Sequence, residues 1–258
     1  MRDRSASIQK KDNSSAFAKK ACTDVRTQMK RFTVLLALVV AIAPFATALA
    51  QNDVSALKQK ATAGDPAAQI KLGMKYALAT PRETEEAMKW FKLAADKGYA
   101  EGQYRLGGMY DVAVSPQNPT EAIKWYTLAA NQGYKDAEYR LAVMYDRGRG
   151  ADRDYAEAAR WYTKAAETGR PEAQLRLGEM YEQGSGVPQS YTEAMKWYLM
   201  AAQQGHADSA KAEYKIGYLY EKGLGTSQSK SEAIAWYQKA GAHGYPDATD
   251  AMKALQEK

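Results

Sequence analysis

Cysteine and histidine are scarce in this 258-residue chain, which contains one Cys and two His. The single cysteine, Cys22, precedes residues 51–258, so the body of the chain has no thiol for a disulfide framework, a metal site or nucleophilic catalysis. His206 and His243 each lie beside a glycine, and two histidines without cysteine make no convincing zinc site. The sequence therefore predicts no metal, no cofactor and no catalytic residue.

Excess charge is also lacking beyond the first 50 residues. The net charge is +6, but residues 1–50 hold nine basic and three acidic side chains, which account for the whole excess. Residues 51–258 carry 27 side chains of each sign. Because a neutral surface with interspersed charges offers no basic patch to a phosphate backbone, we expect no nucleic-acid partner.

One long apolar run is present, over residues 32–43. It lies between two basic residues and a proline followed by a small-residue motif, in the order Lys30, Arg31, Pro44, Ala48, Leu49 and Ala50. This order is typical of a secretory signal peptide, which we predict over residues 29–50 with cleavage after Ala50. A membrane anchor is the alternative, because the run approaches spanning length.

Residues 1–28 are polar and unpatterned, and they precede a complete signal. We interpret them as a disordered extension and expect translation to begin at Met29. The alternative is a start at Met1, which would only lengthen the basic region of the signal peptide. The mature product would be periplasmic or secreted in a bacterium, without stable membrane insertion.

Tryptophan recurs at nearly constant spacing, and each copy lies in a phrase such as AARWYTKAAETG. The five copies are Trp90, Trp125, Trp161, Trp197 and Trp236. A second phrase such as YRLAVMY precedes each of them, and its apolar residues Tyr139, Ala142 and Tyr145 fall on one helical face. Self-similarity at this period indicates stacked structural repeats, each made of helix A, a loop and helix B.

Helix ends are marked by capping and stop residues. Capping-box residues precede helix B in units two to five, at Asn118, Asp154, Ser190 and Ser229. A stop glycine follows each helix B, at Gly98, Gly133, Gly169, Gly205 and Gly244. We therefore expect a capping helix at 51–64, repeats at 65–99, 100–134, 135–170, 171–210 and 211–245, and a closing helix at 246–258.

The pattern L-G-x-x-Y-x-x-G-x-G, followed by E-A-x-x-W-Y-x-x-A-A-x-x-G, resembles the Sel-1-like repeat family, whose members are related to tetratricopeptide repeats. The resemblance covers about residues 65–245 and implies an all-α fold, a right-handed α-solenoid of five helix-turn-helix repeats with capping helices. Units one and two depart from the pattern, since their loops are shorter and lack its glycines. We expect the five tryptophans and one aliphatic residue per helix A to form the core, at Leu72, Leu106, Leu141, Leu177 and Ile216.

The resemblance also implies a binding groove along the A helices. Its aromatic positions are Tyr104, Tyr139, Tyr214 and Tyr218, and its acidic positions are Asp111, Asp146, Glu182 and Glu221. Tyrosine is a favoured anchor in recognition, and an acidic edge would steer basic partners. The alternative is that the tyrosines only pack between helices.

Acid-to-base pairs four residues apart occur on three A helices. They are Glu101–Arg105, Asp136–Arg140 and Glu172–Arg176. We predict that each forms an ion pair on a solvated helix face.

Together these features predict an exported scaffold, adaptor or regulator, not an enzyme, that binds another protein of the cell envelope. Two alternatives remain, a β-lactamase-like or peptidoglycan-related hydrolase and a carbohydrate-binding module. Ser55–Lys58 and Ser227–Lys230 match the S-x-x-K motif of penicillin-binding enzymes, but the companion S-D-N and K-T-G motifs are absent. The branch of the family that is linked to penicillin binding carries cysteine pairs, which residues 51–258 lack.

Overall fold

A computed structural model describes residues 54–80, 83–113, 117–204 and 207–257. Every regular element in these ranges is a helix. None of the helices described is both long and apolar enough to cross a membrane. The expected extension 1–28, the signal peptide 29–50 and its cleavage site lie outside the described ranges.

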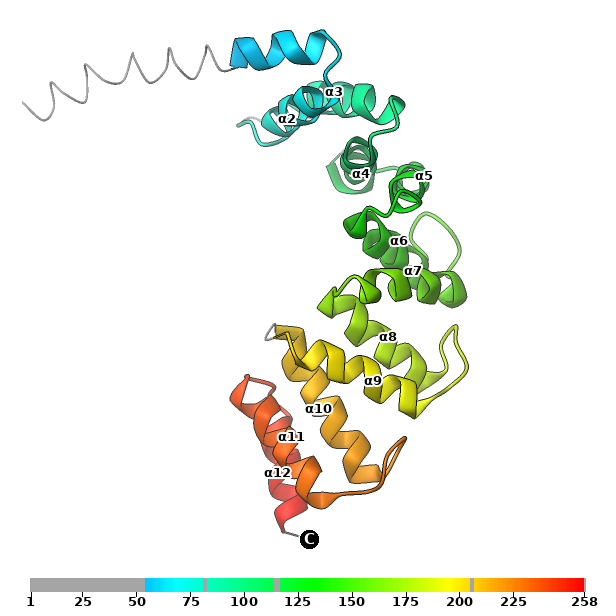
Figure 1. Cartoon of the computed structure of the whole chain (residues 1–258), viewed down its shortest axis with the longest axis vertical. Helices are drawn as coiled ribbons and strands as arrows, with labels where there is room; N and C mark the ends of the chain where they lie inside the picture. Colours follow the sequence, from blue (N-terminus) through cyan, green and yellow to red (C-terminus); the bar gives the residue numbers. More distant parts are fainter. Residues whose placement is uncertain (1–53, 81–82, 114–116, 205–206, 258) are drawn as a thin grey trace, which may run out of the picture. The chain divides into compact units, whose positions relative to one another are not determined.

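Helices A and B alternate along the chain (Figure 1). The A helices are α2 (Pro66–Ala77), α4 (Ala100–Gly108), α6 (Lys135–Arg147), α8 (Pro171–Gln183) and α10 (Ala207–Lys222). The B helices are α3 (Thr84–Asp96), α5 (Pro119–Ala130), α7 (Tyr155–Glu167), α9 (Tyr191–Ala202) and α11 (Lys230–Ala242). Residues 54–62 form a helix before α2, and α12 (Ala248–Gln256) follows α11.

The capping residues start the B helices where the sequence predicts. The side chains of Asn118, Asp154, Ser190 and Ser229 each accept a hydrogen bond from the backbone N–H three residues later, at 2.9–3.3 Å. Each bond pairs one of the N–H groups that a helix start leaves unpaired. Four of the predicted stop glycines have positive φ angles, at Gly98, Gly133, Gly169 and Gly244, and Gly205 lies outside the described residues.

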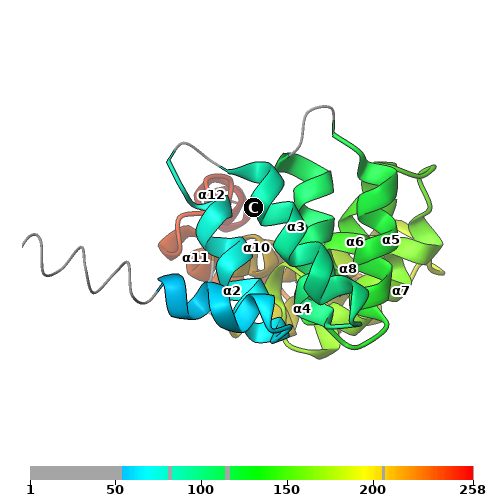
Figure 2. The same cartoon turned by 90° about the horizontal axis from the view of Figure 1, so that it is seen from above.

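Residues 60–258 form one compact unit, and its described helices pack mainly against their neighbours in the chain (Figures 1 and 2). Helix A packs on helix B of the same repeat, and helix B packs on helix A of the next. Successive A helices also meet, as α8 and α10 do. This sequence of contacts confirms the expected all-α solenoid, in which each unit buries its apolar face against the next.

The core lies between these helices. The aliphatic residue of each helix A is fully buried, at Leu72, Leu106, Leu141, Leu177 and Ile216. Trp90, Trp161 and Trp197 are buried, whereas Trp125 and Trp236 are half-buried. The residue after each tryptophan is buried more completely, at Phe91, Tyr126, Tyr162, Tyr198 and Tyr237.

Glycine in the L-G phrase allows helix A to approach this aromatic residue. A Cβ atom at Gly178 would lie 2.5 Å from Cε1 of Tyr198, which is too close for any residue with a side chain. The Tyr198 ring therefore packs directly against the α8 backbone, and its hydroxyl extends toward the end of helix A. This position brings the hydroxyl to the candidate groove.

Repeat 2 departs from the other repeats, as its atypical loop suggests. Its helix A, α4, has nine residues and continues into a π-helical turn, η1 (Met109–Ala113). A π-helical turn is rare and often marks a functional site. Here the π-helical turn replaces the last α-helical turn of helix A in repeat 2.

Candidate functional site

The predicted groove tyrosines are half-buried on the A helices, at Tyr104, Tyr139, Tyr214 and Tyr218. Three of them contact the buried tyrosine of helix B in their own repeat. The ring centroids of Tyr104 and Tyr126 are 5.7 Å apart, and those of Tyr139 and Tyr162 are 6.0 Å apart. Tyr214 contacts Tyr237 in the same way, at 5.2 Å.

The last residue of the same repeat, just before the following helix, covers the other side of each tyrosine. Tyr134 lies 5.0 Å from Tyr104 between ring centroids, and Tyr245 lies 4.7 Å from Tyr214. At Tyr139 the guanidinium of Arg170 takes this place, 4.1 Å from the ring centroid. The tyrosines therefore pack between helices and still expose part of each ring, so packing and partner binding are compatible.

The predicted acidic residues form part of the structure between repeats. Asp146 accepts hydrogen bonds from the Tyr162 hydroxyl at 3.2 Å and from Nε and Nη2 of Arg176 in the next repeat, both at 2.8 Å. Glu182 repeats this geometry, with the Tyr198 hydroxyl at 2.5 Å and Lys215 Nζ at 3.0 Å. Each carboxylate thus joins helix B of its own repeat to helix A of the following one.

Glu221 and Asp111 occupy the same position with different partners. The Tyr237 hydroxyl donates to Glu221 at 2.8 Å, and Lys222 Nζ lies 2.6 Å from the other carboxylate oxygen. Asp111 is buried, and Nε of Arg149 lies 3.0 Å from its carboxylate. Because every predicted acid has a basic partner, these pairs offset much of the negative charge expected along the groove.

The hydroxyl groups that bind these carboxylates remain protonated at neutral pH. Burial, followed by the charge of Asp146, raises the pKa of Tyr162 above its usual range. Burial and then the hydrogen bond to Glu182 raise the pKa of Tyr198 similarly. Both hydroxyl groups therefore serve as donors that orient the carboxylates.

Two of the three expected pairs within helix A are wrong. Glu101 and Arg105 do pair, with Oε1 and Nη2 3.1 Å apart. Asp136 instead pairs at 2.6 Å with Arg170, the residue just before α8, and Arg176 reaches back to Asp146 of the preceding repeat. A guanidinium where two repeats meet has carboxylates available from both, and Arg176 binds Asp146 of the preceding repeat as well as Glu179 of its own helix.

His243 is not an isolated loop residue, because its Nδ1 lies 2.8 Å from the carboxylate of buried Glu213. His206 lies outside the described residues. Within the described ranges, no three His, Cys, Asp or Glu side chains form a group that could hold a metal ion.

The sequence-based prediction of the groove did not include the basic residue that precedes the buried aliphatic residue of each helix A. It recurs at Lys71, Arg105, Arg140, Arg176 and Lys215. Its recurrence can be read from the sequence, but its partner about 30 residues earlier cannot, since that distance depends on how the repeats stack.

Comparison with known proteins agrees with the fold described above. A crystal structure of c5321, a protective antigen of uropathogenic Escherichia coli with an SLR fold, is 35% identical with a TM-score of 0.70. It matches 78% of this chain and 43% of its own. A Sel1 repeat protein from Oxalobacter formigenes is 35% identical, with a TM-score of 0.64, over 78% of this chain and 59% of its own. The chain thus spans about half the length of these relatives.

An F-box protein of Arabidopsis thaliana, At1g70590, is 37% identical over 56 residues, which are 22% of this chain and 16% of that protein. The model of the Sel1 repeat matches residues 66–99, 100–134, 135–169, 171–206 and 210–245. Sel1 repeat proteins commonly mediate protein–protein interactions and are typically scaffolds without enzymatic activity. With five such repeats in tandem and the matching helical geometry, the chain belongs to the Sel1 repeat family.

Proposed function

We propose that this protein is an exported scaffold that binds another protein of the cell envelope through the groove of its A helices. Membership of the Sel1 repeat family supports the binding role. The signal-like sequence over residues 29–50 supports export. The observation that carries the choice of surface is the recurrence of a half-buried tyrosine at one position of three A helices, Tyr104 in α4, Tyr139 in α6 and Tyr214 in α10.

Tyrosine suits this role because its ring supplies a large apolar contact and its hydroxyl a hydrogen bond, with little loss of side-chain entropy. Rings already held by a neighbouring tyrosine or guanidinium, as Tyr139 is by Arg170, are ordered before the partner arrives. Such preorganisation reduces the entropic cost of binding. We therefore expect binding energy to concentrate on these rings rather than on the paired carboxylates.

The role of the acids differs from the sequence-based expectation. Asp146 joins two repeats, so Asp146→Asn would weaken the contact with Arg176 as well as change the charge of the groove. Partner binding is better tested at Tyr139, whose removal leaves the Asp146 pair in place.

Crosslinking in envelope extract followed by affinity capture identifies the partner. Tyr139→Ala should then weaken its binding by at least about 1 kcal/mol. The matched controls change Lys124, Arg160 or Lys196 on the B helices, whose side chains are 60–67% exposed. Melting curves for each variant separate loss of binding from loss of folding. Binding that resists Tyr139→Ala but is lost in the helix B variants would place the partner on the other face and refute the groove assignment.

Export is tested separately by the intact mass of the protein recovered from the periplasm. A mass equal to that of residues 51–258 supports cleavage after Ala50. Recovery in the membrane fraction with residues 29–50 still attached contradicts the proposal.

A further inference from the structure

The ion pairs between successive repeats form a series that is interrupted in the amino-terminal half of the described structure. In repeats 4 and 5, the base before the motif leucine binds the groove acid of the preceding repeat, as Arg176 binds Asp146 and Lys215 binds Glu182. In both repeats, the carboxylate that binds the base therefore comes from the same chain. The corresponding bases of repeats 2 and 3 are Arg105 and Arg140.

Neither Arg105 nor Arg140 has such a carboxylate from the preceding repeat. The position that would serve Arg105 is occupied by Ala77, which leaves it the partly exposed Glu101 of its own helix. The acid that would serve Arg140 is Asp111, but Asp111 pairs with Arg149. Within the described ranges, no carboxylate lies in ion-pair distance of Arg140, which lines a pocket together with Tyr104 and Tyr126.

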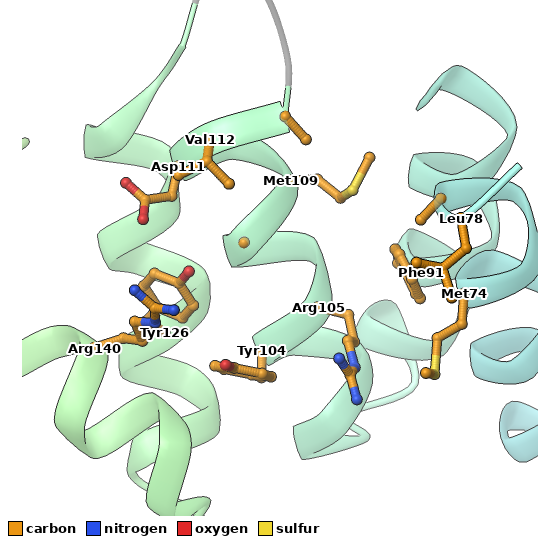
Figure 3. Close-up of a pocket in the computed structure, with 13 residues that line it drawn as sticks. Met74, Leu78, Phe91, Tyr104, Arg105, Met109, Asp111, Val112, Tyr126 and Arg140 are labelled. Carbon is orange, nitrogen blue, oxygen red and sulfur yellow. The ribbon is translucent and has the colours of Figure 1, made fainter. Parts of the chain in front are cut away.

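A pocket of about 300 Å³ lies where the series is interrupted. Figure 3 shows Arg105 between Tyr104 and an apolar group from repeat 1, with Arg140 beside Tyr126 on the opposite side. The apolar lining comes from α2, α3, α4 and η1 and comprises Met74, Leu78, Phe91, Met109 and Val112. Positive charge and apolar surface therefore meet in one opening.

A glycine helps to keep this pocket open, and the rim of the pocket is apolar. Gly108 occupies the groove position at which the other repeats have Met74, Val143, Glu179 and Tyr218. The rim residues Leu78 and Val112 are 77% and 62% exposed, the largest fractions among the large apolar side chains described. Apolar residues exposed together at a pocket are typical of a binding site rather than of plain surface.

We propose that this pocket binds an acidic side chain flanked by apolar residues in a segment of the partner protein. The partner would supply to Arg140 the carboxylate that the chain supplies to Arg176 and Lys215. This inference rests on the proposed function, because it assigns the partner segment to the same groove.

Charge complementarity identifies the occupant. Guanidinium groups bind carboxylates in a two-pronged geometry, as Arg176 does with Asp146 through two bonds of 2.8 Å. The one acid that lines the pocket, Asp111, is already paired with Arg149, which leaves the guanidinium of Arg140 without an ion-pair partner and attractive to an anion. Leu78, Val112 and their neighbours require that the residues beside the carboxylate be apolar.

The test uses the full chain and two fluorescein-labelled peptides with blocked ends, whose central sequences are Leu-Glu-Phe-Leu and Leu-Gln-Phe-Leu. Fluorescence anisotropy should show that the Glu peptide binds at least about tenfold more tightly, the size of a charge-assisted pair. Arg140→Gln should remove this preference without changing the affinity for the Gln peptide. Arg160→Gln, on an exposed B-helix arginine, is the matched control and should have no effect.

Gly108→Val tests the cavity itself, because valine stands at this position in repeat 3 as Val143. A Cβ atom at Gly108 would meet only the Tyr126 hydroxyl, at an ordinary 3.5 Å, so the variant should fold. It should weaken both peptides by filling the apolar space. An unchanged melting temperature confirms that loss of binding arises from the pocket.

Three results overturn the inference. They are equal affinity for the two peptides, an Arg140→Gln variant that retains the preference for Glu, and binding of decanoate without any binding of the Glu peptide. The third result would indicate a site for amphiphilic anions. A captured envelope partner that depends on Tyr139 but not on Arg140 or Gly108 would refute the pocket and leave the proposed function intact. A partner insensitive to Tyr139 as well would refute the groove, while the peptide preference would still test the pocket.

Discussion

Replacing one buried carboxyl group in repeat 3 should stabilise the protein. In repeats 1, 2 and 4, a buried glutamine on helix A donates from Nε2 to a backbone carbonyl at the end of the preceding helix. These bonds are Gln69 to Ala61 at 3.0 Å, Gln103 to Ala95 at 3.4 Å and Gln174 to Ala166 at 3.0 Å. Repeat 3 has Glu138 at this position.

Glu138 is a poor substitute for glutamine because an ionised carboxylate has no hydrogen to donate. The residue is 5% exposed, and its Oε2 is buried without a hydrogen-bond partner. Burial raises the pKa of Glu138 above its usual value, although the nearby charges of Lys164 and Lys135 oppose this effect. Glu138→Gln should place an amide donor opposite the carbonyl of Ala130, eight residues earlier, as in the other repeats.

The expected gain combines two effects. A new hydrogen bond contributes about 0.5–1.5 kcal/mol, and an unpaired buried polar group costs about 1–3 kcal/mol. Loss of the attraction to Lys164 and Lys135 offsets part of this sum. We therefore expect the free energy of unfolding to rise by about 1–2 kcal/mol and the melting temperature by about 2–8 °C at this chain length.

Urea unfolding followed by circular dichroism measures the effect at several pH values. The pKa of Glu138 is higher in the folded than in the unfolded chain. Protonation of Glu138 therefore contributes its full stabilisation at pH values below the pKa in the unfolded chain. This contribution is lost as the pH rises through the pKa in the folded chain. The advantage of Glu138→Gln should thus be largest at neutral pH and shrink as the solution is acidified.

Gln174→Glu, the reverse change in repeat 4, is the matched control. It replaces the donor that binds Ala166 and should destabilise the protein at neutral pH by a similar amount. Unchanged or lower stability of Glu138→Gln at neutral pH, together with a destabilised Gln174→Glu, would refute the reasoning. That result would mean that Lys164 and Lys135 stabilise the ionised carboxylate more than an amide could.

Two further changes test the stacking of repeats by denaturant unfolding. Trp161→Ala in the central repeat should lower the free energy of unfolding by about 3–5 kcal/mol. Trp236→Ala should lower it by less, because Trp161 is 4% exposed whereas Trp236 is only half-buried. Equal losses would contradict a core built from neighbouring repeats. Gly186→Ala should destabilise the protein more than Gly169→Ala, although both glycines have positive φ angles. A Cβ atom at Gly186 would lie 2.1 Å from the carbonyl oxygen of Tyr155, whereas one at Gly169 would meet nothing within 4 Å. Similar midpoints for the two alanine variants would show that the loop of repeat 4 does not depend on its contact with helix α7.

The sequence by itself determined the repeat, the number of units and most helix ends. These features depend on residues a few positions apart, whose proximity follows from helix geometry alone. Asn118 and Ser190 accept from the N–H three residues later wherever their helix packs. Apolar residues at helical spacing likewise identified the buried aliphatic residue of each helix A, such as Leu141.

Only the tertiary structure decided which charges meet. The pair Glu172–Arg176 was a reasonable expectation from spacing on one helix, yet Arg176 binds Asp146 from the preceding repeat. That choice depends on the distance between two stacked helices, and spacing along one helix carries no information about it. The same reason applies to the pocket. Arg140 lacks a carboxylate partner because Arg149 of its own repeat pairs with Asp111, and this pairing depends on how the repeats stack.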